Sequence, residues 1–469
     1  MSETKSYIQK LFAGNNILIA NNRAHLFEEF VNQEDSINAV KTILENQKYL
    51  MANWNLKTRI ADIVQQHIVI PNGTVGKEYE AKLDFQKLNW NDIISYELEN
   101  LDLIGLEYDH SNETIKGTPS QSGDIKIKFK FRVSGESEDS ALNEKQISLV
   151  VNPDPKSLWK NIESDKNDPY WKEDNITAFQ KLGNKHIVVS SKRGRSHANV
   201  GSFRDDDFSF AHLENTGWSI VVVADGAGGS KTSRKGSSIS CQSIIDYFSE
   251  NITEDNFAEF DTLIAQQQNG SEEESLKKLN LFVYNQLGKA ALHAHKKLEE
   301  FATTIEAPLK DLHTTLIFAL VKKYEFGHAI LSFGVGDCPI GILNKDLTKI
   351  DLMNWLDVGE FGGGTRFITM PEIFKSDKFS TRFGFRLVQD FSYLILMTDG
   401  IYDPKFVVEA NLEKIDKWQE FLDDLNGKNP DNIKVEFNSE NKEIEQQLSS
   451  WMDFWNAGNH DDRTLAIVF

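Results

Sequence analysis

The sequence has little cysteine and no long apolar run, and each shortage argues against a class of protein. Only two cysteines, Cys241 and Cys338, occur among 469 residues, so no disulfide framework is expected and both are interpreted as small core residues of a reduced protein. No stretch approaches the roughly 20 apolar residues of a membrane span. Residues 1–12 also lack the apolar core of a signal peptide. We therefore expect a cytoplasmic protein without a membrane partner.

Positive charge is scarce as well. The chain has 51 Lys and Arg residues against 71 Asp and Glu residues, which gives a formal net charge of −20 at pH 7. Such a chain is repelled by nucleic acid and by anionic membrane surfaces, so neither is expected as its main partner. Hydrophobic residues make up 40% and aromatic residues 11% of the chain, ample for packed cores, and the length predicts two to four domains.

The first 66 residues are predicted to be helical. Apolar residues such as Ile37, Val40 and Ile43 recur at helical spacing among charged residues. No residue pattern here indicates chemistry. We therefore interpret residues 1–66 as a helical cap or docking segment.

Residues 67–152 change to short strand-like runs between turn residues. The run Ile125–Val133 alternates apolar and basic residues, as a half-buried strand does, and we predict a small all-β sandwich. Residues 72–79 (Asn-Gly-Thr-Val-Gly-Lys-Glu-Tyr) and 115–124 (Ile-Lys-Gly-Thr-Pro-Ser-Gln-Ser-Gly-Asp) resemble an immunoglobulin-like module found in many bacterial proteins. That resemblance implies binding or spacing and no catalysis.

Residues 153–180 are predicted to form a linker that lies against one of the domains. The sequence Asn152-Pro-Asp-Pro155 cannot form regular structure, because each proline restricts the residue before it. Trp159 and Trp171 make the segment too aromatic for a purely flexible tether. A last domain, residues 181–469, is predicted to follow.

This last domain is organised around aspartates at the ends of strand-like runs. The β-branched run Ile220–Val223, typical of a buried strand, is followed by Asp225-Gly226. An ordinary strand-ending turn is the alternative, because Asp-Gly is a common turn pair. The arrangement recurs, however, and gives five acidic positions beside strand-like runs: Asp205-Asp206, Asp225, Asp337, Asp399 and Asp461.

The acidic positions indicate a metal site. Carboxylates that converge without basic partners repel one another and have raised pKa values, so a cation is expected to neutralise them. No Lys or Arg recurs beside every acidic position, and no Cys or His pair has zinc spacing. Oxygen ligands suit Mg²⁺ or Mn²⁺, and two such ions can activate a water molecule and direct it at phosphorus.

The ordered set of motifs resembles the metal-dependent protein phosphatase family, also called protein phosphatase 2C-like. The motifs stand here as Asp205-Asp206, Asp225-Gly-Ala-Gly-Gly229, Thr314-Thr-Leu316, Gly336-Asp-Cys338, Thr398-Asp-Gly400 and Asp461-Asp-Arg-Thr464. The resemblance spans residues 186–469 and implies an α+β fold in which a catalytic β-sandwich is flanked by helices. It also implies a serine/threonine phosphatase with a phosphorylated protein substrate and a cognate kinase.

The same resemblance implies roles for the acidic residues. Asp225 would bridge two Mn²⁺ or Mg²⁺ ions, and Asp337 would hold a third, weaker ion seen in bacterial members. The residues expected to hold metal are Asp205, Asp206, Asp225, Gly226 (through its carbonyl), Asp337, Asp399 and Asp461. Asp225, Asp399 and Asp461, together with His197, would be the catalytic residues.

Two departures from the family pattern concern phosphate and metal. Gly201 stands where the family often has an arginine that grips phosphate, and His197 matches a histidine variant seen in some bacterial members. Arg195 and Arg204 are further candidates for phosphate binding, and a solvated basic loop is the alternative for all three. Asp462 replaces an asparagine, and would either tighten metal binding or face water.

Other residues are weaker candidates. His212, His313 and His460 could protonate the leaving oxygen, with a structural histidine as the alternative for each. His460 is the best of the three because it precedes a predicted ligand. The acidic pair could also include Asp207, and Cys338 stands where the family has serine.

Two functions compete. In the first, the chain is an active phosphatase in which a metal-activated water molecule attacks phosphorus in line, with no phosphoenzyme intermediate. In the second, it is a catalytically inactive scaffold that acts through its immunoglobulin-like module. Inactive members usually lose metal carboxylates, whereas every one is present here, which favours the active enzyme. A purely adhesive protein would leave the acidic positions unexplained.

Overall fold

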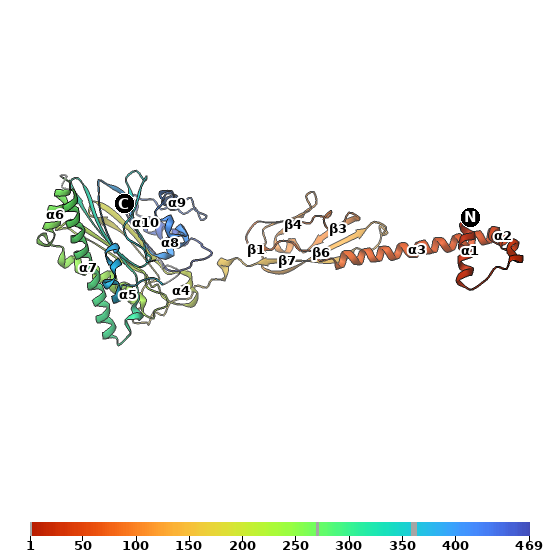
Figure 1. The fold of residues 1–469 in the computed structure, drawn as a ribbon, viewed down its shortest axis with the longest axis horizontal. Coiled ribbons are helices and arrows are strands. Elements are labelled where there is room, and N and C mark those ends of the chain that lie inside the picture. Colours follow the sequence, from red (N-terminus) through yellow and green to blue (C-terminus); the bar gives the residue numbers. More distant parts are fainter. Residues whose placement is uncertain (1, 269–271, 358–363) are drawn as a thin grey trace. The chain divides into compact units, whose positions relative to one another are not determined.

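The computed structural model describes residues 2–268, 272–357 and 364–469 (Figure 1). The chain divides into two compact units, Met1–Leu158 and Trp159–Phe469. Among the described residues, no helix is both long enough and apolar enough to span a membrane.

The first unit begins with the helices α1 (Glu3–Gly14), α2 (Ala24–Asn32) and α3 (Glu34–Gln65). A small cluster of buried apolar residues joins them: Ile8, Phe27, Val31 and Val40. Helix α3 ends one residue before the boundary expected at 66, and its last turns bury Ile63 in the core of the following β structure.

The rest of the first unit forms two sheets in the described residues. One has the strand order β1-β7-β6-β3 and the other β2-β5-β4. The strands are β1 (Gly73–Thr74), β2 (Tyr79–Lys82), β3 (Ile93–Glu99), β4 (Leu106–Asp109), β5 (Thr114–Gly117), β6 (Gly123–Val133) and β7 (Asn143–Asn152). Alternate residues of β6, such as Phe129 and Phe131, are buried, as its sequence pattern predicts. The immunoglobulin-like resemblance stays a prediction.

The second unit contains two packed antiparallel sheets. The first has the order β10-β11-β12-β13-β16 and the second β15-β14-β17-β18-β9-β8. The first sheet comprises β10 (Asp207–Leu213), β11 (Trp218–Ala224), β12 (Leu316–Tyr324), β13 (Gly327–Val335) and β16 (Phe383–Val388). The second comprises β8 (Asn175–Leu182), β9 (Lys185–Lys192), β14 (Ile340–Asn344), β15 (Ile350–Leu352), β17 (Phe391–Met397) and β18 (Arg463–Val468). Apolar side chains from both, including Val223 and Leu396, form one buried core between them.

Helices cover the outer face of each sheet (Figure 1). On the first sheet they are α5 (Ser233–Asn251), α6 (Glu254–Gln268) and α7 (Glu272–Thr304). On the second they are α8 (Asp399–Phe406), α9 (Ile415–Leu425) and α10 (Ile444–Trp451), while the short α4 (Arg195–Val200) follows β9. Strand β11 is buried along its whole length because helices pack on one face and the other sheet on the opposite face. The predicted α+β fold, a β-sandwich flanked by helices, is confirmed.

The segment expected to be a linker is divided differently in the structure. Residues from Trp159 onward belong to the second unit, and strand β8 already begins at Asn175. We call residues 159–174 the strap. Its backbone and side chains form hydrogen bonds within the second unit, for example from the N–H of Lys160 to Asn199 Oδ1 (3.0 Å). The boundary expected at 180/181 therefore lies too late, because the aromatic and polar residues of the strap are part of the packed unit.

Candidate active site

The predicted acidic residues meet at one end of the sandwich in the second unit. Asp206 directly precedes β10 and Asp225 directly follows β11, and these strands are antiparallel neighbours. Asp337 and Asp399 follow β13 and β17, while Asp461 precedes β18. Burial, and then the charges of the other four carboxylates, raise the pKa of Asp225 well above its ordinary value. The carboxylates are therefore close enough to repel one another.

The Thr314-Thr315 motif holds the turn at Asp225. The N–H of Asp225 donates to Thr315 Oγ1 at 2.9 Å, and its carbonyl accepts from Thr314 Oγ1 at 2.8 Å. A Cβ on Gly226 would lie 2.6 Å from the carbonyl oxygen of Asp205, so only glycine lets these two acidic segments approach. The two threonines were not among the predicted site residues, although their motif is visible in the sequence.

Asp206 joins the two sheets at the base of the acidic group. Its Oδ2 accepts hydrogen bonds from Thr398 Oγ1 and Thr464 Oγ1, both at 2.8 Å. Thr398 follows β17 and Thr464 lies in β18, so a carboxylate of the first sheet is fixed by hydroxyls of the second. Burial, followed by the charge of Asp462, raises the pKa of Asp206 to about 8.

The acidic group fits hard divalent cations. Asp399 Oδ1 is buried and has no hydrogen-bond partner among the described residues. Burial, followed by the charges of neighbouring carboxylates with Asp461 first, raises the pKa of Asp399 well above its ordinary value. In the described ranges, ion pairs reach the edge of this group, but none reaches Asp225 or Asp399. An oxygen-only set with an unpartnered buried oxygen is what Mg²⁺ or Mn²⁺ would satisfy.

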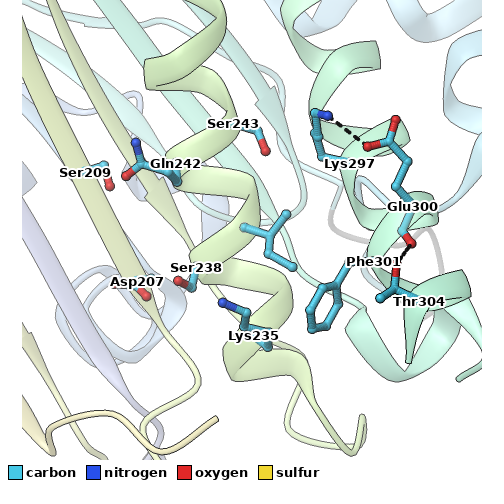
Figure 2. Close-up of a pocket in the computed structure, with 11 residues that line it drawn as sticks. Asp207, Ser209, Lys235, Ser238, Gln242, Ser243, Lys297, Glu300, Phe301 and Thr304 are labelled. Carbon is cyan, nitrogen blue, oxygen red and sulfur yellow. Dashed lines mark hydrogen bonds and ion pairs between the residues drawn. The ribbon is translucent and has the colours of Figure 1, made fainter. Parts of the chain in front are cut away.

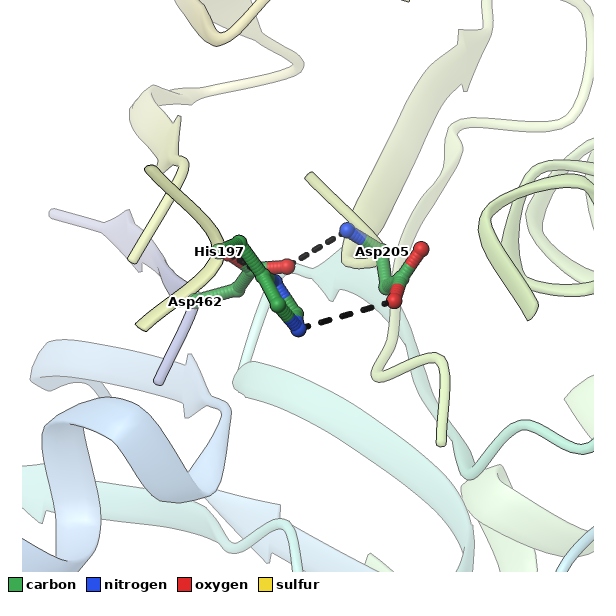
Figure 3. A group of neighbouring side chains, drawn as sticks. All are labelled: His197, Asp205 and Asp462. Carbon is green, nitrogen blue, oxygen red and sulfur yellow. Dashed lines mark hydrogen bonds and ion pairs between the residues drawn. The ribbon is translucent and has the colours of Figure 1, made fainter. Parts of the chain in front are cut away.

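Asp462 fixes the edge of the site together with His197 and Asp205 (Figure 3). Its Oδ1 accepts from the N–H of Gly194 at 2.6 Å and lies 3.0 Å from His197 Nδ1, while its Oδ2 accepts from the N–H of Asp205 at 2.5 Å. Of the two roles expected for Asp462, the structure contradicts the one in which it faces water. The side chain is 2% exposed, so it does not face water, and its oxygens are occupied by protein donors. Asp462 holds the His197 loop against the acidic pair.

His197 lies beside a predicted ligand. Its Nε2 is 3.8 Å from Asp205 Oδ2, and the three side chains of Figure 3 offer ligand atoms within 4.8 Å of one another. Burial lowers the pKa of His197, but the hydrogen bond and charge of Asp462, with the charges of Asp205 and Asp461, outweigh it and raise the pKa to about 9. Because the oxygens of Asp462 already accept hydrogen bonds, we interpret this trio as a support for Asp205.

Residues 193–452, more than half of the chain, match the sequence model of the protein phosphatase 2C family. The chain belongs to this family. Similar solved structures include a bacterial serine phosphatase (15% identity, 60% of this chain and 96% of that chain, TM-score 0.35). They also include the serine/threonine phosphatase Stp1 from Staphylococcus aureus (14% identity, 62% of this chain and 96% of that chain, TM-score 0.35). A third is PppA from Pseudomonas aeruginosa (12% identity, 63% of this chain and 98% of that chain, TM-score 0.33). A comparison with curated proteins finds no match.

The structure separates the three basic residues expected to bind phosphate in this phosphatase 2C member. His197 is beside the acidic group. Arg195 instead donates to the backbone carbonyls of Asp453 (2.7 Å) and Phe454 (3.2 Å). Arg204 is fully buried, and its Nη1 donates to Ser191 Oγ and to the carbonyl of Asp206, both at 2.6 Å. Arg204 thus supports the acidic turn from behind, and its position does not favour phosphate binding.

The other histidines have structural contacts. His212 lies near the end of β10 opposite the acidic group, where its Nδ1 is 2.9 Å from a serine hydroxyl. The Nδ1 of His313 is 2.6 Å from a threonine hydroxyl. The ring of His460 lies near those of Trp159 and Trp455, with centroid distances of 4.4 and 4.9 Å. The hydrogen bonds of His212 and His313 favour a structural role for these two residues.

Asp337 is held in place by a threonine hydroxyl. Its Oδ2 accepts a hydrogen bond from Thr365 Oγ1 at 2.7 Å, and burial raises its pKa. The preceding turn is fixed by Asp357, whose Oδ2 accepts from the N–H of Gly336 at 2.9 Å. Asp357 is itself bound by both terminal nitrogens of Arg382, at 2.5 and 2.9 Å. A buried ion pair therefore supports the position predicted for the third ion.

A pocket of about 520 Å³ lies beside Asp207, and none of the proposed metal ligands is among its lining residues (Figure 2). It is bordered by β10, α5 and α7, and Asp207, Lys235 and Phe301 are among its lining residues. Asp207 pairs with Lys172 at 3.2 Å. Of the acidic run 205–207, only Asp207 lines this pocket.

Proposed function

We propose that this phosphatase 2C family member hydrolyses phosphoserine or phosphothreonine in proteins, using two Mn²⁺ or Mg²⁺ ions. The observation that carries the proposal is the buried Oδ1 of Asp399, which has no hydrogen-bond partner among the described residues and lies inside a group of carboxylates whose charges raise its pKa. A protein that used this fold only as a scaffold would gain nothing from that repulsion. We also propose that the enzyme is cytoplasmic and acts opposite a cognate kinase.

The residues that would hold the ions come from both sheets. The proposed ligands are Asp205, Asp206, Asp225, the carbonyl of Gly226, Asp399 and Asp461, with Asp337 for a third ion. When bound, the ions would lower the pKa of a water molecule and withdraw charge from phosphate oxygens. The protein keeps the carboxylates in register through the hydroxyls of Thr314, Thr315, Thr398 and Thr464.

His197 is proposed to bind the phosphate. Its Nδ1 is occupied by Asp462, which leaves Nε2 as the nitrogen that can donate to a phosphate oxygen next to Asp205. Gly228 keeps this side open, because a Cβ there would already lie 3.5 Å from His197 Nε2. In the reaction, the oxygen of water forms a bond to phosphorus, the ester bond to the serine or threonine oxygen breaks, and a proton passes to that oxygen.

The direct test is phosphate release from a phosphothreonine peptide at increasing Mn²⁺. Wild type should be active only with the ion, and Asp225→Asn should lose nearly all activity together with heat-detected Mn²⁺ binding. Asp346→Asn, which removes the same charge from an exposed loop, serves as the control. If wild type binds Mn²⁺ but releases no phosphate from peptides or small phosphoesters, the chain is the inactive scaffold instead.

The role of His197 is tested at saturating Mn²⁺. His197→Ala should lower kcat/KM by roughly a hundredfold, because one fixed donor to developing charge contributes about 2–4 kcal/mol. Arg195→Ala, two residues away on α4, should stay within about threefold of wild type because its donors face backbone carbonyls. Equal losses in both variants would show that α4 acts only as a folded unit.

A further inference from the structure

Lys172, in the strap, is a buried ammonium behind the acidic residues. Its side chain is 14% exposed, and Nζ donates to the carbonyl of Asp206 at 2.6 Å. Nζ also lies 3.2 Å from the carbonyl of Arg234, 3.2 Å from Asp207 Oδ2 and 3.4 Å from Ser237 Oγ. One side chain thus binds both the acidic turn and the first turn of α5.

The groups around Lys172 also bind one another. Ser237 Oγ donates to the carbonyl of Asp205 at 2.5 Å, so α5 reaches the first residue of the acidic pair. Arg204 Nη1 donates to the same Asp206 carbonyl that Lys172 binds. The backbone of the acidic pair is therefore held on three sides, by a lysine, an arginine and a serine.

The strap is hydrogen-bonded to two helices of the second unit, α5 and α4. Arg234 Nη2 donates to Asp168 Oδ1 at 2.8 Å, which anchors the strap to α5. The N–H of Ile162 donates to the carbonyl of Ala198 at 2.8 Å, which anchors it to α4. The strap therefore contacts both the helix that carries His197 and the helix that supports the acidic pair.

Burying an ammonium costs several kcal/mol unless its partners are well placed, so such a group indicates a specific structural requirement. The strap also lies upstream of residues 193–452, the part that matches the family model.

We propose that Lys172 is a positioning residue of the active site and that the strap is an integral part of that site. The ammonium holds the backbone of Asp206 against α5, so that the carboxylates of the acidic pair point at the ions. This role rests on the proposed function in one respect, which is that the acidic pair binds metal ions.

The test uses full-length Lys172→Met, which keeps the length of the side chain and removes its donors. Calorimetric affinity for Mn²⁺ should fall by about 10–100-fold, the usual effect of losing a residue that orients a metal ligand. Saturating Mn²⁺ should restore kcat to within about threefold of wild type, because the reacting groups are unchanged. Lys166→Met is the matched control, since Lys166 lies in the strap and is 65% exposed.

Lys172→Gln separates hydrogen bonding from charge. It retains a donor for the Asp206 carbonyl and should recover part of the lost Mn²⁺ affinity; it also supplies the measurement if Lys172→Met does not fold. Wild-type affinity in the variants, with or without a lower Tm, would overturn the positioning role. Tighter Mn²⁺ binding in both would also overturn it, by showing that the ammonium only competes with the ions. Loss of wild-type phosphatase activity with intact Mn²⁺ binding would refute the proposed function alone.

Discussion

Replacing Asp399 with asparagine should stabilise the metal-free protein. Asp399 lies among carboxylates whose charges raise its pKa, and its Oδ1 has no partner among the described residues. Asp399→Asn keeps the shape and removes one of the repelling charges. Relief of such active-site strain is worth about 0.5–2 kcal/mol, which raises the Tm of a unit of this size by roughly 1–5 °C.

The same variant should be the less stable protein when Mn²⁺ is present. At a concentration 100 times the dissociation constant, a bound ion stabilises the folded state by about 2.7 kcal/mol. Losing one carboxylate ligand should weaken binding at least a hundredfold, which removes about 2.3 kcal/mol of that stabilisation, more than the gain of about 0.5–2 kcal/mol in the metal-free protein. The order of the two Tm values therefore reverses between EDTA and Mn²⁺.

Scanning calorimetry of the second unit's transition, in EDTA and in Mn²⁺, measures this reversal. Asp346→Asn should leave both Tm values within about 1 °C of wild type, because Asp346 is exposed. A lower Tm for Asp399→Asn in EDTA would refute the reasoning. It would mean that the aspartate stabilises the fold and that the acidic group is not under electrostatic strain.

Three further outcomes are expected. A protein that starts at Asn175 should be less stable and less soluble than one that starts at Trp159, because it lacks the strap; equal Tm values would restore the later domain boundary. Burial lowers the pKa of His328 to about 4 in the folded protein. Between pH 6.5 and pH 4 the unfolded chain therefore binds more protons than the folded one, and the free energy of unfolding falls by about 3 kcal/mol as the pH falls through this range. Urea unfolding of His328→Gln should show a correspondingly shallower pH dependence, and an unchanged slope would contradict it. Arg382→Met should cost about 3–5 kcal/mol by leaving the Asp357 carboxylate buried and unpaired, and adding Asp357→Leu should recover part of the lost Tm.

The parts of the site that could be predicted are those written into local sequence. A buried strand that stops at an aspartate and a glycine, as at Asp225, fixes both the direction of the chain and the place of the carboxylate. Several such strand ends can converge only at an end of a sheet, so the acidic group followed once the fold class was correct. Gly226 is also visible in the local sequence, and only glycine fits at this position beside the Asp205 carbonyl.

The supporting contacts could not be read in this way. Asp462 was visible as an acid in place of an asparagine, but nothing in the sequence shows that its oxygens accept from Gly194 and Asp205. Arg204 was predicted as a phosphate ligand because it is next to the acidic pair in the sequence. In the structure its side chain is fully buried. Lys172 was missed because it lies in a segment without a motif, more than 30 residues before its partner. Such contacts depend on which side of the backbone faces the core.

The place of β18 in its sheet has a consequence for how the protein folds during its synthesis. This strand is inserted between β9 and β17, with Ile467 opposite both Val188 and Ile395. Strand β9 is made about 270 residues earlier, so at 5–20 residues per second it waits roughly 15–55 s on the ribosome with one edge unpaired. An apolar strand in that state is a target for chaperones and for pairing with neighbouring nascent chains. Asp461 arrives with β18, so a nascent chain gains its complete acidic group only when the central strand closes the sheet.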